Sequence, residues 1–189
     1  MSTKLFKTLS GITLIAILAL GLMAFAPAGT AAAAAVERPS GPGGWGTSPA
    51  APGTGLALAP LSASEKDALS QAVLEEYGAL NLYQSVIAKF GNVYPFSVIV
   101  RAEQQHINVL TQQAAKYGVT LPANPGLSNP PAFSTLSAAC QAGAAAEIAD
   151  AALYDQLKPA VTHSDLQQVF NNLQSASLTS HLPAFQACQ

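Results

Sequence analysis

The sequence predicts an all-α protein whose helices form an antiparallel four-helix bundle, and three observations lead to this fold class. From residue 62 onward, apolar residues recur at the three- and four-residue intervals of a helix face, and no strand-like alternation of any length appears. Glycine and proline divide this region into four such stretches. The first and third connections are short and the second is long, which favours two helical hairpins packed against each other.

The first two predicted helices have clear start and stop signals. The first begins at Ser62, with Glu65 three positions later as its capping-box partner, and ends at Gly91. The second has Pro95 in its first turn and ends at Gly118. Because only a short turn separates them, we expect these two helices to be antiparallel neighbours.

A proline-rich crossing over residues 121–131 leads to the second pair of helices. The third helix is expected over roughly 134–157, since Lys158-Pro159 stops it. The fourth begins near Thr162, with Asp165 as its capping partner, and runs to the C-terminus. Gly143 lies on the apolar face of the third helix, where its missing side chain lowers helix propensity but permits close packing.

Residues 1–35 have the layout of a secretory signal peptide. Lys4 and Lys7 precede an apolar run over residues 12–25, and A-x-A cleavage sites end at Ala28 and Ala35, of which we favour Ala35. The run is shorter than the roughly 20 residues of a membrane-spanning helix, so no stable span is expected after cleavage. The protein is therefore predicted to be secreted, periplasmic or displayed on the cell surface. An uncleaved N-terminal anchor is the alternative.

Residues 36–61 are predicted to be a flexible linker rich in proline, glycine and alanine, which leaves 62–189 as the bundle domain. The whole chain of 189 residues is 50% hydrophobic and only 10% charged, which excludes a disordered protein. Lys4 and Lys7 are the only charged residues before Val36, so acidic residues outnumber basic ones in the exported part. No basic patch is available for phosphates, and nucleic-acid binding is excluded.

Six ionisable side chains interrupt the apolar faces of the four predicted helices. An unpaired carboxylate is very costly to bury, so their concentration there is the most informative feature of the sequence. They are Glu76 in the first helix, Glu103 and His106 in the second, Glu147 and Asp150 in the third, and His181 in the fourth. Four carboxylates and two imidazoles form the mixed oxygen and nitrogen ligand set of a dinuclear iron or manganese site, and two divalent cations would offset the four negative charges.

The spacing of the two cysteines from the predicted ligands supports the pairing of the third and fourth helices. Cys140 lies seven residues before Glu147, and Cys188 lies seven residues after His181. Any antiparallel register that pairs Glu147 with His181 therefore also brings the cysteines level. In an exported protein this placement predicts a Cys140–Cys188 disulfide, with metal ligation by the cysteines as the lesser alternative.

Several stretches resemble the ferritin-like superfamily, and within it most closely the bacterial and archaeal domain-of-unknown-function 2202 family. They are Glu75-Glu76-Tyr77, Pro95-Phe96 through Glu103-Gln-Gln-His106, Tyr117-Gly118, and Ser180-His181-Leu182-Pro183-Ala184-Phe185. The resemblance spans about residues 62–186 and implies a ferritin-like bundle with a candidate metal site, but no settled activity.

The chain departs from the di-iron pattern of that superfamily in the fourth helix. A second Glu-x-x-His is expected there, and Leu178 stands at the Glu position. One hypothesis is that Asp150 compensates from the third helix. Pro183 is expected to bend or end the fourth helix just past His181.

Other polar and aromatic residues near the candidate site have plainer interpretations. Glu75 is expected to be a solvated surface charge, and His163 an exposed residue at the start of the fourth helix. Tyr83 and Tyr154 are expected to pack in the core, with hydrogen bonding to the carboxylates as the alternative. Gln104 and Gln105 are expected on the surface.

Two functions remain open from the sequence. The first is a di-metal protein, with oxidase or peroxide chemistry as the furthest extent of its activity. The second is a metal-free structural or interaction module, secreted or surface-displayed, whose alanine-rich helix faces serve homo-oligomerisation or partner binding. Copper storage through sulfur is excluded, because the only methionines are Met1 and Met23 and the cysteines form one pair.

Overall fold

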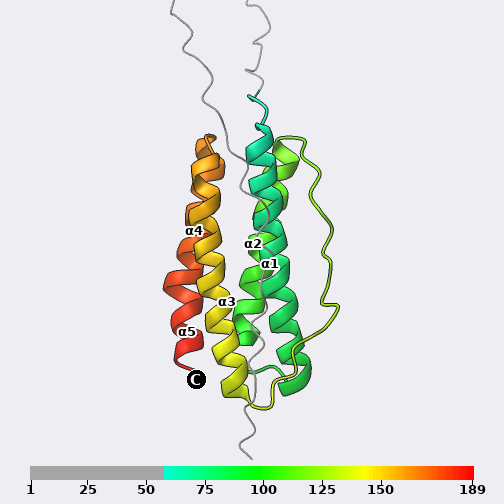
Figure 1. Ribbon diagram of the computed structural model, residues 1–189, viewed down its shortest axis with the longest axis vertical. Coiled ribbons are helices and arrows are strands. Elements are labelled where there is room, and N and C mark those ends of the chain that lie inside the picture. The colour runs from blue at the N-terminus through cyan, green and yellow to red at the C-terminus, as the bar shows by residue number, and fades with distance from the viewer. Residues whose placement is uncertain (1–57) are drawn as a thin grey trace, which may run out of the picture. The chain divides into compact units, whose positions relative to one another are not determined.

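A computed structural model describes residues 58–189, which form four helices packed as a bundle (Figure 1). The all-α class is confirmed, and no strand occurs among these residues. The predicted signal peptide and residues 36–57 of the predicted linker lie outside the described residues. The elements are α1 (Ala63–Phe90), α2 (Phe96–Lys116), α3 (Leu136–Leu157), the short 3-10 helix η1 (Lys158–Ala160), α4 (Ser164–Ala176), the π-helical turn η2 (Ser177–His181) and α5 (Leu182–Gln186).

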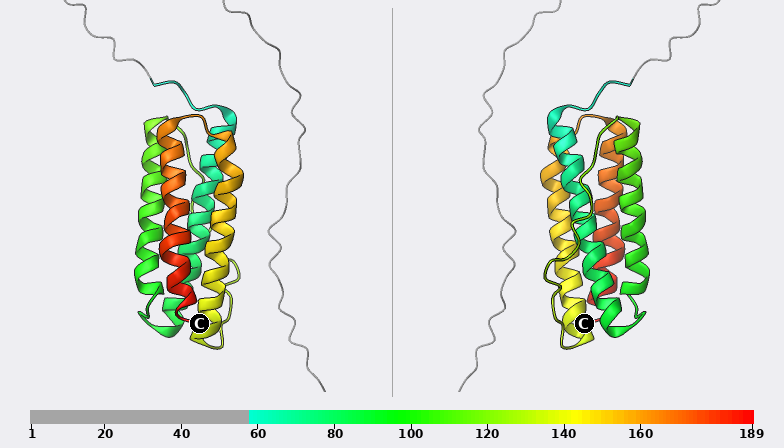
Figure 2. Two further views of the ribbon diagram at one scale, coloured as in Figure 1. Left: turned by 90° about the vertical axis from the view of Figure 1, so that its left-hand side faces the viewer. Right: turned by 90° about the vertical axis from the view of Figure 1, so that its right-hand side faces the viewer.

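The chain forms two antiparallel hairpins joined by one long crossing. Helix α2 returns along α1, and the segment after it runs back along the outside of the bundle to the start of α3 (Figures 1 and 2). The elements α4, η2 and α5 then form one continuous column that returns along α3. Paired hydrogen bonds between the side-chain amides of Asn81 and Asn124, of 2.7 and 3.2 Å, hold the crossing to α1.

The predicted capping box at the start of α1 is present, and its glutamate does more than expected. Ser62 Oγ accepts from the Glu65 amide at 3.2 Å, and Glu65 Oε2 accepts from the Ser62 amide at 2.8 Å. The other oxygen, Oε1, accepts from the backbone amides of Thr162 and His163 at 2.8 and 3.0 Å and lies 2.8 Å from His163 Nδ1. One buried carboxylate therefore caps α1 and the entry to α4 together. Burial opposes its ionisation, but the bonds from His163, Ser62 and Thr162 hold the pKa of Glu65 well below its usual range.

Two expectations for the start of the fourth helix are wrong for the same reason. His163 is not exposed, because its imidazole contacts Glu65 and leaves only 19% of the side chain accessible. Asp165 does not cap α4, which begins at Ser164 with no side-chain cap. Its carboxylate instead accepts from Lys116 Nζ at 2.7 Å and from the Tyr117 hydroxyl at 2.8 Å, at the end of α2. Glu65 supplies the capping acceptor, so Asp165 is free to join α2 to α4.

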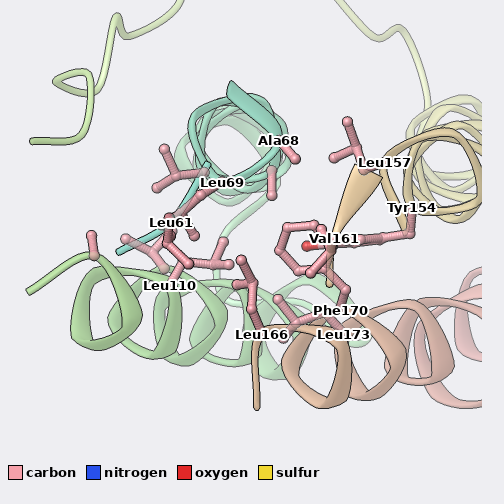
Figure 3. Packing of buried hydrophobic residues seen from close by; sticks show 14 of the residues in the cluster. Leu61, Ala68, Leu69, Leu110, Tyr154, Leu157, Val161, Leu166, Phe170 and Leu173 are labelled. Carbon is pink, nitrogen blue, oxygen red and sulfur yellow. The ribbon is translucent and has the colours of Figure 1, made fainter. Parts of the chain in front are cut away.

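The apolar core consists of two clusters along the bundle. In the first, side chains from all four helices converge, and Leu61, predicted as the last linker residue, packs among them (Figure 3). The second cluster surrounds Tyr83, Phe96 and Phe185. The close approach predicted at Gly143 occurs here, since a Cβ added at that position would lie 2.6 Å from the Phe185 ring.

The predicted disulfide is confirmed. Cys140 in α3 is bonded to Cys188, just after α5, with the two Cα atoms 5.8 Å apart. It joins the helices that carry Glu147 and His181, in the register the sequence predicts. Within residues 58–189, no helix combines the length and apolar character that crossing a bilayer requires.

Candidate metal centre

The six residues predicted as metal ligands are all buried in the middle of the bundle. On α2, α3 and the fourth helix they lie between the two apolar clusters: on α2, Glu103 and His106 follow Ile99 of the second cluster and precede Ile107 of the first. On α1, Glu76 lies at the edge of the first cluster, between Val73 and Leu80. The ligand set therefore forms a polar layer between two apolar ones, to which α1, α2, α3 and η2 each contribute at least one side chain.

Five of the six form two triads that share one glutamate. In the first triad, His106 Nδ1 lies 3.1 Å from Glu76 Oε2 and 3.1 Å from Glu103 Oε2. In the second, His181 Nδ1 lies 3.1 Å from Glu103 Oε1 and 3.2 Å from Glu147 Oε2. Within each triad, one ligand atom from every residue lies within 4.8 Å of the others. Glu103 thus presents one oxygen to each triad, which is the position of a bridging carboxylate.

The protein's own donors do not complete the bonding of this central glutamate. Each imidazole Nδ1 carries one proton at most, yet each faces two carboxylate oxygens. Glu103 Oε1 is buried with no hydrogen bond of acceptable geometry, although His181 Nδ1 is near. One cation in each triad would supply the missing positive charge. The oxygen and nitrogen donors of the triads suit first-row transition metals. The residues therefore fit a dinuclear carboxylate centre.

The electrostatics show how much charge is packed into this layer. Burial and the neighbouring Glu103 raise the pKa of Glu76, against the opposing effect of His106. For Glu103, burial opposes ionisation, but the two imidazoles at 3.1 Å outweigh it and lower the pKa. Although burial disfavours the imidazolium ions, the surrounding carboxylates raise the pKa of His106 to about 10 and that of His181 to about 9. Without metal, protons on the imidazoles therefore balance part of the carboxylate charge.

Tyr83 and Tyr154 pack in the core, as expected, and also donate hydrogen bonds to the centre, which is the alternative interpretation. Tyr83 Oη donates to Glu147 Oε1 at 2.5 Å, and Tyr154 Oη donates to Glu76 Oε1 at 2.6 Å. The spacing could have revealed them, because each tyrosine follows a site glutamate by seven residues on its own helix. The bonds cross between helices: the α1 tyrosine reaches the α3 glutamate, and the α3 tyrosine reaches the α1 glutamate.

Asp150 is buried but belongs to neither triad. Its Oδ2 accepts from Ser177 Oγ at 2.6 Å, and its Oδ1 has no hydrogen-bond partner. Burial, with the charges of Glu75 and Glu147, raises the pKa of Asp150 to about 7 against the Ser177 hydrogen bond. The structure places this carboxylate beside the centre, and the hypothesis that it replaces a missing glutamate ligand stays a prediction.

The π-helical turn η2 determines where the expected Glu position of the fourth helix, Leu178, points. The wider turn leaves both Ser177 and His181 buried, while Leu178 is 44% exposed. A glutamate at position 178 would therefore point away from the triads. The helix widens to a π-helical turn before Pro183 and returns to α-helix in α5. An end of the fourth helix just past His181, one of the two expected outcomes, does not occur, because the helix continues to Gln186. The π-helical turn lies just before Pro183, which has no backbone N–H to donate.

Glu75 differs from its expected role as a solvated surface charge. It is partly buried, and burial together with the charges of Glu147 and Glu103 raises its pKa. The carboxylate therefore lies near enough to the centre to feel its charge. Gln104 and Gln105 are exposed, as predicted.

Fold and site together define this chain as a four-helix-bundle protein whose buried Glu/His clusters are compatible with a carboxylate metal site. Two solved structures are similar to it, each with a TM-score of 0.60 over 68% of this chain. One is the hypothetical protein MJ0754 from Methanococcus jannaschii, with 25% sequence identity over 81% of its length. The other is the conserved hypothetical protein Rv2844 from Mycobacterium tuberculosis, with 15% identity over 98% of its length, a likeness of fold alone. No protein-family model and no curated protein matches the chain.

Proposed function

We propose that this chain is an exported ferritin-like protein, of the kind found in the domain-of-unknown-function 2202 family, that binds two iron or manganese ions in its core. The observation that carries the proposal is the place of Glu103, with one oxygen in each of two Glu/His triads. Glu76 and His106 complete one set of ligands, and Glu147 and His181 the other. The disulfide supports an extracytoplasmic location, since such bonds persist in oxidising compartments.

The protein's side chains have distinct parts in this proposal. The imidazoles would have to lose their protons to become ligands, so bound metal would take over the charge balance that these protons provide in its absence. Tyr83 and Tyr154 orient the outer glutamates, Glu147 and Glu76, through hydrogen bonds. Ser177 holds Asp150 beside the triads, where its carboxylate could serve as a further ligand. Bound iron or manganese would supply redox chemistry toward oxygen or peroxide.

Elemental analysis of the mature protein tests the proposal. The protein is purified from its native compartment without chelator or nickel affinity resin, and about two equivalents of iron or manganese per chain are expected. The Glu103→Ala/His106→Ala variant should lose this metal. The matched control is Gln104→Ala/Gln105→Ala, on the exposed side of the same helix turn, which should keep it. Metal well below one equivalent, unchanged after aerobic incubation with ferrous iron, would refute the proposal.

One observation favours the metal-free module as the second candidate. Both outer glutamates already accept a tyrosine hydrogen bond and face an imidazole, so the outer parts of the layer are satisfied without a cation. In that case the Glu103→Ala/His106→Ala variant should lose stability, because it leaves buried partners unmatched. Thermal unfolding of the parent protein would then be the same with added manganese as with chelator.

A further inference from the structure

Two buried tyrosines treat the two outer glutamates of the centre in the same way. Tyr83 donates to Oε1 of Glu147, and Tyr154 donates to Oε1 of Glu76. In both glutamates the second oxygen, Oε2, is the one that faces an imidazole. Each outer glutamate therefore directs one oxygen to a phenol and only one into its triad.

Packing against other aromatic rings holds both phenols in place independently of their hydrogen bonds to the glutamates. Both tyrosine side chains are fully buried. The Tyr83 ring packs between Phe96 and Phe185, with centroid distances of 5.8 and 5.0 Å. The Tyr154 ring packs edge-on against Phe170 at 5.3 Å. Rings held in this way cannot follow a glutamate that turns both oxygens toward a cation, so the phenols restrain the glutamates.

We propose that Tyr83 and Tyr154 are positioning residues that limit Glu147 and Glu76 to one ligating oxygen each and so make the centre select transition-metal dications over calcium. The inference rests on the proposed function. Calcium takes six to eight oxygen ligands and often binds carboxylates through both oxygens. First-row transition-metal dications take at most six ligands, and iron in particular favours the imidazole nitrogen that each triad supplies. A phenol that occupies the second oxygen of a glutamate therefore penalises calcium more than a transition metal.

Cobalt(II) is a suitable probe, because its visible absorption is strong at low coordination number and weak when six ligands surround it. The test variant is Tyr83→Phe/Tyr154→Phe, which removes both hydroxyls and keeps the rings. The matched control is Tyr117→Phe, whose hydroxyl donates to the Asp165 carboxylate at 2.8 Å outside the centre. Each protein is titrated with cobalt(II), alone and in competition with calcium, and its spectrum is recorded.

The wild type should bind cobalt(II) with an intense visible band and resist a large excess of calcium. In the double variant the ratio of cobalt to calcium affinity should fall by about tenfold or more, in line with the effect of other groups that orient metal ligands. Its band should weaken as freed carboxylate oxygens join the coordination shell. Tyr117→Phe should match the wild type in both measurements.

Two other results would have separate meanings. If the double variant binds cobalt with the wild-type affinity ratio and spectrum, the hydroxyls only satisfy buried carboxylates and the inference is wrong. If the wild type binds neither cobalt, iron nor manganese, the proposed function itself fails. Should the double variant not fold, the single variants decide the matter: each hydroxyl serves one triad, so each variant should alter one of two binding events. Single variants identical to the wild type would overturn the inference.

Discussion

Gly143 and Gly78 are both helical glycines, and the structure predicts opposite effects when each is replaced by alanine. A Cβ at position 143 would lie 2.6, 2.7 and 2.9 Å from three atoms of the Phe185 ring. At position 78 it would meet nothing within 4 Å. Non-bonded carbon atoms are best separated by about 3.5–4.0 Å, so Gly143→Ala requires a shift of roughly 1 Å.

The Phe185 ring has little room for such a shift. It is fully buried, and its centroid lies 5.0 Å from those of both Tyr83 and Phe96. The disulfide also ties the segments together, because Cys140 precedes Gly143 by three residues and Cys188 follows Phe185 by three. Over-packing of this kind costs about 1–3 kcal/mol, whereas replacing a helical glycine with alanine gains about 1 kcal/mol.

Gly78→Ala should therefore raise the free energy of unfolding by about 1 kcal/mol. The free energy of unfolding of Gly143→Ala should be about 2 kcal/mol lower than that of Gly78→Ala. For a domain of this size the difference corresponds to roughly 8 °C in Tm. Urea denaturation and calorimetry of the disulfide-bonded protein measure both quantities. Adding Phe185→Leu to Gly143→Ala should recover part of the difference between the glycine variants. If Gly143→Ala is as stable as Gly78→Ala, the close approach of α3 and α5 is wrong.

Two further predictions concern buried charge. The metal-free protein should lose roughly 2 kcal/mol or more between pH 5 and pH 9, because the raised pKa values of Glu76 and Asp150 destabilise the fold once these groups ionise. The stabilising charges on His181 and His106 are also lost as pH rises from 6.5 toward their pKa values of about 9 and about 10. Calorimetry with chelator and with manganese should show Tm falling with pH in the first case, and a manganese-induced rise in Tm that grows with pH, since ligands must lose protons to bind metal. A metal-free Tm that rises over this range would contradict the charge assignment. Glu65→Gln should cost about 2–4 kcal/mol, because an amide cannot accept at both ends of the double cap. Asp67→Asn, on the exposed side of the same turn, should change stability by less than about 0.5 kcal/mol, and equal effects of the two changes in urea denaturation would refute the double cap.

Local chemistry made much of the fold predictable. The Ser62 and Glu65 capping box, the glycine after α1 and the stop at Lys158-Pro159 act within a few residues, so they can be read without knowing what packs nearby. The same holds for the buried glutamates and histidines, because a charged residue on an apolar helix stripe is conspicuous in the sequence alone.

The residues whose surroundings were predicted wrongly or incompletely are those that make contacts between helices. Tyr83 and Tyr154 look like core residues on their own helices, and only the height of α1 against α3 brings their hydroxyls to Glu147 and Glu76. His163 looks exposed until the start of α1 places Glu65 beside it. Glu75 looks solvated until the packing of the helices buries it near Glu147 and Glu103, and burial and these charges raise its pKa.

The sequence by itself determined four helices, the register of the second hairpin through its cysteines, and the burial of the six candidate ligands, because helix period and breakers act along the chain. The tertiary structure decided how those groups divide into two triads around Glu103, which oxygen each tyrosine occupies, and that a π-helical turn turns Leu178 outward while it keeps His181 inside. These outcomes depend on the relative rotation and height of neighbouring helices. The packing of side chains between the helices sets both the rotation and the height.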